Sequence, residues 1–232
     1  MDQKAVPGVS LEGWTIVFDL DGTLVESAPD LLNALNHTIG REGLAPVDLN
    51  DIRTMIGHGA KAMISHAFAR SGRSIGGTDL DAFWTVFLDH YRANIAVDSF
   101  IFEGVEPALQ ALSSHGATLS VCTNKTQALS ELLLHELEIL GHFSSVVGAD
   151  SVPAKKPHGD HILAAIDLAK GTRDRAIMVG DSKTDEKAAL NAGLPFIFVP
   201  FGYEAAPMED IEHAGVLHHY SELLGRVLAL AG

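Results

Sequence analysis

Short apolar runs recur along the chain at wide intervals, and each is bounded by polar or glycine residues. Four of them are rich in apolar and β-branched side chains: residues 15–18, 118–122, 176–179 and 196–199. Runs of this length and composition are typical of strands that are buried on both faces of a parallel sheet. The pattern therefore predicts four strands of one such sheet.

Helical periodicity fills the spaces between these runs. Residues 105–114, 126–140, 158–169 and 184–192 can each place an apolar stripe on one side of a helix. Strands that alternate with helices predict an α/β fold with a doubly wound, mostly parallel sheet, which is a Rossmann-like core.

The interval between the first two runs is different, because helical patterns occupy it almost throughout. Helices are expected at residues 30–39, 50–56, 60–71 and 79–95, with glycine-containing turns between them. This interval is too long for one crossover helix, so it predicts a small helical domain inserted after the first strand, with the sheet resuming near Phe100. We expect the α/β core to span 12–28 and 99–232, and the inserted helical cap domain to span 29–98.

Charge and length narrow the class of protein. The chain has 232 residues and 47% hydrophobic content, enough for a substantial core, and 30 acidic against 16 basic residues give a formal charge of −14. That sign opposes broad contact with a phosphate backbone, so no nucleic-acid partner is expected. Residues 1–7 lack the apolar stretch of a signal peptide, and no segment approaches the ~20 apolar residues of a membrane span. We expect a cytoplasmic protein without a membrane partner.

Polar side chains follow the predicted strands at their carboxyl ends, where open α/β sheets bind ligands. They are Asp19 and Asp21 after the first strand, Thr123 and Asn124 after the second, Asp181 and then Asp185 after the third, and Lys156 in a loop.

Crowded carboxylates are usually stabilised by a hard divalent cation with oxygen ligands. Mg²⁺ between Asp19 and Asp181 would let Asp19 stay ionised and attack an anionic phosphoryl group. Asp21 would then protonate the leaving oxygen and afterwards activate water. Neutral donors on Thr123 and Asn124 and the cation of Lys156 would support the phosphoryl oxygens.

Each of these residues also has an ordinary structural explanation. An isolated Asp-x-Asp pair is common in turns, Thr and Asn are good helix caps, and Asp185 suits the first turn of a helix. Lys155 is expected to be a solvated neighbour of Lys156. The order of the motifs, each after a buried strand, favours a functional site over these explanations.

In this order the motifs resemble those of the haloacid dehalogenase-like phosphatases across nearly the whole chain. The resemblance rests on Asp19-Leu20-Asp21-Gly22-Thr23, Thr123-Asn124, Lys156-Pro157, and Gly180-Asp181-Ser182 with Asp185. It implies an aspartyl-phosphate intermediate on Asp19, with Asp21 as general acid and base. It also implies Mg²⁺ held by Asp19, the backbone carbonyl of Asp21 and Asp181, with Asp185 supporting the metal site.

Further stretches resemble the phosphoglycolate phosphatase branch of that family. They are Arg53-Thr54-Met55-Ile56-Gly57-His58-Gly59-Ala60, Lys155-Lys156-Pro157-His158 and Phe201-Gly202-Tyr203, while Glu103 and Gly159 stand where proline is usual. The resemblance implies a hydrolase that converts 2-phosphoglycolate to glycolate and phosphate. A phosphosugar phosphatase or mutase, a pyrophosphatase and a noncatalytic phosphate-sensing module remain alternatives, and the sequence leaves the oligomeric state open.

The predicted cap holds the candidates for substrate selection. The turn of Gly57, His58 and Gly59, with Lys61 beyond it, offers backbone N–H groups and cations to a substrate carboxylate, although it also suits a plain helix–helix linker. Trp84, Phe87 and Tyr91 recur at helical spacing and are interpreted as a packing stripe.

Overall fold

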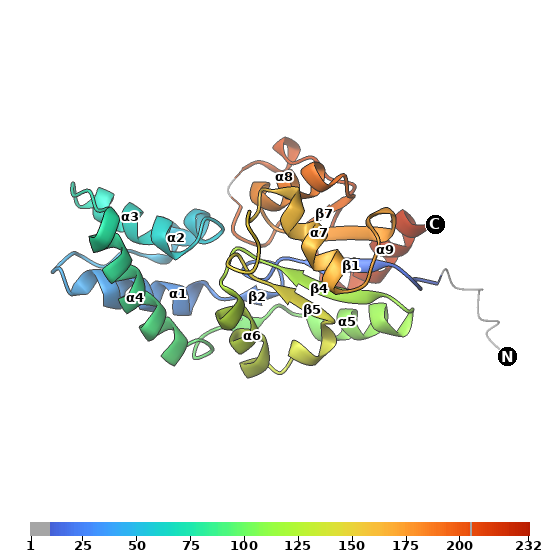
Figure 1. The fold of residues 1–232 in the computed structure, drawn as a ribbon, viewed down its shortest axis with the longest axis horizontal. Coiled ribbons are helices and arrows are strands. Elements are labelled where there is room, and N and C mark those ends of the chain that lie inside the picture. Colours follow the sequence, from blue (N-terminus) through green and yellow to red (C-terminus); the bar gives the residue numbers. More distant parts are fainter. Residues whose placement is uncertain (1–9, 205) are drawn as a thin grey trace.

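A six-stranded parallel sheet forms the centre of the computed structural model, which describes residues 10–204 and 206–232 (Figure 1). The strand order is β5-β4-β1-β6-β7-β8. The strands are β1 Thr15–Phe18, β4 Thr118–Cys122, β5 Ser145–Val147, β6 Ala176–Gly180, β7 Phe196–Phe198 and β8 Gly215–Val216. The four predicted strands are confirmed, and the short edge strands β5 and β8 are additional.

Side chains alternate between the two faces of the sheet, and helices cover both. In β1, Ile16 and Phe18 join one hydrophobic cluster and Val17 joins the other. The first cluster includes residues of α5 Val105–Ser114, α6 Gln127–Glu136 and α9 Leu223–Ala231, and the second those of α7 Gly159–Leu168 and α8 Lys183–Ala192. The doubly wound prediction is therefore confirmed. The helix expected over residues 126–140 ends earlier, at Glu136, and Leu140–His142 form a separate 3₁₀ turn.

The expectation that the main sheet resumes near Phe100 is wrong. β3 Phe100–Ile101 pairs with β2 Val25–Glu26 in a separate antiparallel ribbon. After the helices, the chain returns next to β2, the segment that led away from the main sheet. The first extended residues on its return therefore pair with β2 instead of the main sheet.

Four helices lie between β2 and β3 in the sequence: α1 Ala28–Gly40, α2 Leu49–Ile56, α3 Ala60–Arg70 and α4 Gly77–Ala93. They match the four expected helices to within about two residues at each end. Neighbouring helices of this set pack on one another, and Figure 1 shows them as a group beside the sheet. Asp48 and Asp51 form a capping box that begins α2.

The two chain segments that lead into and out of this helical group are joined by a buried aspartate. Asp30, in the first turn of α1, accepts hydrogen bonds from the backbone N–H groups of Asp98 and Ser99 and from the Ser99 hydroxyl. Asp30 is 1% exposed, so these donors replace the water that its carboxylate loses.

Over the described residues, no helix has both the length and the apolar character that crossing a bilayer requires. The N-terminal residues 1–7, on which the expectation of a missing signal peptide rested, lie outside the described part of the chain.

Candidate active site

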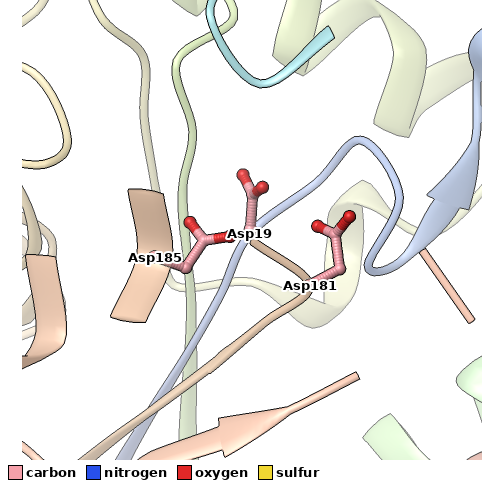
Figure 2. A group of neighbouring side chains, drawn as sticks. All are labelled: Asp19, Asp181 and Asp185. Atoms are coloured by element: carbon pink, nitrogen blue, oxygen red, sulfur yellow. The ribbon is translucent and has the colours of Figure 1, made fainter. Parts of the chain in front are cut away.

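Three carboxylates meet at the carboxyl ends of the central strands. Asp19 follows β1, Asp181 follows the adjacent β6, and Asp185 lies in the first turn of α8. One oxygen from each can be chosen so that all three lie within 4.8 Å of one another, and Figure 2 shows Asp19 between the other two in that view. All three residues are buried.

Burial and mutual repulsion perturb these acids. Desolvation, followed by the charge of Asp185, raises the pKa of Asp19 to about 7, although Lys156 opposes the shift. The pKa of Asp181 is raised well above its ordinary value, first by desolvation and then by Asp185 and Asp19. Burial and mutual repulsion therefore disfavour the ionised forms of Asp19 and Asp181.

Asp181 is held in a narrow cradle. Its carboxylate accepts from the Thr23 hydroxyl at 2.9 Å and from the backbone N–H of Tyr203 at 2.7 Å. A Cβ at Gly22 would lie 2.5 Å from the Asp181 Oδ2 atom, and one at Gly202 would lie 2.4 Å from it, so only glycine allows this approach. An all-oxygen donor set of buried carboxylates fits a hard divalent cation such as Mg²⁺.

Lys156 is the buried cation of the cluster. Its Nζ atom lies 2.7 Å from Asp19 Oδ1 and 2.6 Å from Asp185 Oδ1, and the residue is 2% exposed. Burial opposes its charge, but Asp185 and Asp19 outweigh that effect and hold the pKa of Lys156 above its ordinary value. Asp185 also forms a capping box with Ser182 at the start of α8, so its structural explanation holds.

Asp21 is paired with a lysine that the sequence analysis missed. Lys125 Nζ donates to both carboxylate oxygens of Asp21, at 2.8 and 2.9 Å, and the Ser27 hydroxyl donates to the Oδ1 atom. The Lys125 side chain is only 5% exposed. Its position directly after Thr123 and Asn124, at a strand end, was the available signal.

The two neutral residues of this strand end have different surroundings. Thr123 is buried, and its hydroxyl accepts from the backbone N–H of Lys125. The amide nitrogen of Asn124 donates to the carbonyls of Gly57 and Lys156 at 3.2 and 3.1 Å. Asn124 therefore ties the α2–α3 turn to the core, and its amide N–H groups, which were expected to serve a phosphoryl group, are engaged there.

Two cavities meet at Asp21 and Lys125. A cavity of about 20 Å³ is lined by Asp19, Thr123 and Lys156, among others. A larger one of about 230 Å³ lies between the core and the helices α1, α3 and α4. Asp21, Ile56, Asn124 and Lys125 line both.

The expected substrate residues of the cap lie around these cavities. His58, Gly59 and Lys61 line the larger one, and Gly57 lines the smaller. The N–H groups of Gly57, His58 and Gly59 already donate to carbonyls of the last turn of α2. Lys61 is paired with Asp81 at 2.6 Å. The turn thus borders the cavity, but the backbone donors expected from these three residues are engaged.

The aromatic stripe of α4 also borders the larger cavity, through Trp84, Phe87 and Tyr91. Phe87 and Tyr91 are at the same time buried in the hydrophobic core, as a packing stripe requires.

Comparison with known proteins agrees with the fold and the motifs. The model of a family described as haloacid dehalogenase-like hydrolase matches residues 16–199. A protein named phosphoglycolate phosphatase from Caulobacter vibrioides is 43% identical over 92% of this chain and 90% of its own length. One of the same name from Agrobacterium fabrum is 43% identical over 89% of both chains.

Solved structures show the same architecture. A predicted phosphoglycolate phosphatase from Haemophilus somnus superposes with a TM-score of 0.87 at 27% sequence identity, over 94% of this chain and 99% of the other.

Proposed function

Since the chain belongs to the haloacid dehalogenase-like hydrolases, we propose that it is a Mg²⁺-dependent phosphatase that hydrolyses 2-phosphoglycolate to glycolate and phosphate. Its class as a phosphoric monoester hydrolase rests on the family and on the relatives named phosphoglycolate phosphatase. The observation that carries the proposal is the buried cluster of Asp19, Asp181, Asp185 and Lys156 beside Asp21.

Asp19, Asp181 and the backbone carbonyl of Asp21 would hold Mg²⁺, and Asp185 would support the site through its contact with Lys156. The bound cation would neutralise these carboxylates and polarise the phosphoryl oxygens. Such a charge would offset the burial and mutual repulsion that raise the pKa values of Asp19 and Asp181.

The remaining chemistry belongs to side chains of this chain. A carboxylate oxygen of Asp19 attacks phosphorus, the bond from phosphorus to the ester oxygen breaks, and Asp21 gives that oxygen a proton. Asp21 then takes a proton from water, the water oxygen attacks phosphorus, and the bond from phosphorus to Asp19 breaks. Lys156 stays close enough to Asp19 to neutralise the transferred group throughout.

The helical insertion of residues 29–98 acts, in this proposal, as a lid over the core. The α2–α3 turn borders the cavities on the lid side: Gly57 lines the smaller one, and His58, Gly59 and Lys61 line the larger one.

A turnover assay tests the proposal. The purified chain is incubated with 2-phosphoglycolate, a phosphosugar and pyrophosphate, each with Mg²⁺ or with excess chelator. The proposal expects Mg²⁺-dependent phosphate release, highest in kcat/KM for 2-phosphoglycolate. A higher kcat/KM for the phosphosugar or for pyrophosphate would refute the proposed substrate, and full activity in chelator would refute the metal dependence.

A further inference from the structure

The place where the two cavities meet constrains any substrate. The smaller cavity contains the Asp19 and Lys156 side of the site, where the phosphoryl group must lie for attack. Asp21, which serves the leaving oxygen, lines both cavities. Asp21 also lines a third cavity, of about 100 Å³, together with Asp19 and Arg53. Of the three, the cavity of about 230 Å³ offers a leaving group the most room, and a leaving group that enters it passes Asp21 and Lys125.

The larger cavity contains little to solvate an anion. Much of its lining consists of apolar side chains, among them Leu31, Met63, Phe87 and Leu88. A carboxylate placed there loses its water and requires a buried cation or strong donors.

Lys125 is the cation best placed to meet that need. Its side chain is 5% exposed, whereas that of Lys61 is 47% exposed, and each of the two lysines is paired with one aspartate. His58 and Lys155 also line the cavity, but both are exposed. An ammonium group has three donors, and the two oxygens of Asp21 take two, which leaves one for a ligand.

Tyr91, which lies beside Lys125, supplies an independent observation. The residue is 1% exposed and lines the larger cavity, and its hydroxyl has no hydrogen-bond partner among the described residues. A buried polar group left unpaired is costly and calls for a partner that the chain itself does not provide. Lys125 Nζ lies 4.8 Å from the centroid of the Tyr91 ring, so both residues border the same space.

From these contacts we propose that Lys125 and Tyr91 form the subsite that binds the carboxylate of the leaving group. The ammonium group donates its third N–H to the carboxylate, and the Tyr91 hydroxyl donates to it as well. The inference rests on the phosphatase function proposed above and names the residues that select its substrate class: esters whose carboxylate lies close to the ester oxygen. Since Lys125 also holds Asp21, a carboxylate at this subsite brings the leaving oxygen beside its proton donor.

Two esters that differ in one group provide the test. 2-Phosphoglycolate and 2-hydroxyethyl phosphate are both two-carbon esters, but only the first carries a carboxylate. The measured quantity is the discrimination ratio, which is kcat/KM for 2-phosphoglycolate divided by kcat/KM for 2-hydroxyethyl phosphate. It is determined for the wild type, Tyr91→Phe, Lys125→Met and the control Lys61→Met.

We expect Tyr91→Phe to lower the ratio about tenfold and Lys125→Met to lower it about 100-fold, mainly through KM for 2-phosphoglycolate. Lys61→Met changes it less than about twofold, because that lysine already has a partner outside the subsite. The Tm of Tyr91→Phe stays at or above that of the wild type, since the lost hydroxyl was unpaired. This variant keeps the test decisive even if Lys125→Met fails to fold.

An unchanged ratio in Tyr91→Phe, or in folded Lys125→Met, overturns the assignment of that residue. A fall confined to Lys61→Met moves the subsite to the α2–α3 turn and overturns the inference while leaving the phosphatase intact. A wild type that hydrolyses neither ester removes the proposed function, and the inference falls with it.

Discussion

The strand-end cluster and the α2–α3 turn are both lined with residues suited to anion chemistry, but they are built differently. Asp19, Asp181 and Lys156 are buried. Asp19 and Lys156 form an ion pair, and Asp181 packs closely against Gly22 and Gly202. His58 is exposed, and Lys61 is half-exposed with a partner of its own. Removing one side chain of a buried charged cluster has a large effect, because its former partners are left unpaired. Removing an exposed side chain has a small effect. Mutational effects should therefore fall steeply from the strand ends to the turn.

The largest effect is expected for Asp19→Asn. The amide is no nucleophile, so kcat should fall by at least about 10⁴-fold. Steady-state assays measure the loss, and circular dichroism checks that the fold is kept. Turnover near the wild-type rate would refute the covalent mechanism and remove the contrast with the turn.

Metal removal should come next and has a readout besides activity. Saturating Mg²⁺ should raise the Tm of the wild type by several degrees, because a ligand at about 100 times its Kd adds about 2.7 kcal/mol to the free energy of unfolding. In Asp181→Asn the shift should largely vanish, together with turnover. Lys61→Met is the matched control and should keep the full shift; equal shifts in all three proteins would contradict a site at Asp181.

Two buried tyrosines allow a comparison by the free energy of unfolding, without an activity assay. The Tyr203 hydroxyl donates to Glu26 and accepts from the N–H groups of Ser27 and Ala28, whereas the Tyr91 hydroxyl has no partner among the described residues. Tyr203→Phe should lower the free energy of unfolding by about 1–3 kcal/mol, and Tyr91→Phe should not lower it. Urea titrations of both variants measure the difference. A similar loss in both would show that hydrogen bonding does not separate them.

The smallest effect is expected at the turn. His58→Ala should change kcat/KM for 2-phosphoglycolate by less than about threefold, because an exposed side chain contributes little to binding. A loss above tenfold would place the decisive contact in the turn and reverse the comparison.

The core site could be predicted because local sequence determines it. Short apolar runs ending in polar residues mark strand ends, and parallel strands bring those ends together, so Asp19 and Asp181 could be grouped before any contact was known. The strands β5 and β8 escaped prediction because they are three and two residues long, too short for a periodic pattern.

Lys125 and Tyr91 could not be paired from sequence. Lys125 resembles an ordinary polar residue at the start of a helix, and Tyr91 belongs to an amphipathic stripe whose spacing indicates packing. Their proximity arises only when α4 packs near the end of β4, a long-range contact that no local pattern encodes.

The antiparallel pairing of β2 with β3 has a consequence for how such a protein can change. Val25 faces Ile101 and Glu26 faces Phe100, so both ends of the helical insertion are hydrogen-bonded side by side. The position of the main sheet relative to these two ends is then the same whether four helices or a short hairpin connects them. The segment between these two strands can thus be exchanged at this ribbon while Asp19 and Asp181 keep their positions at the ends of β1 and β6.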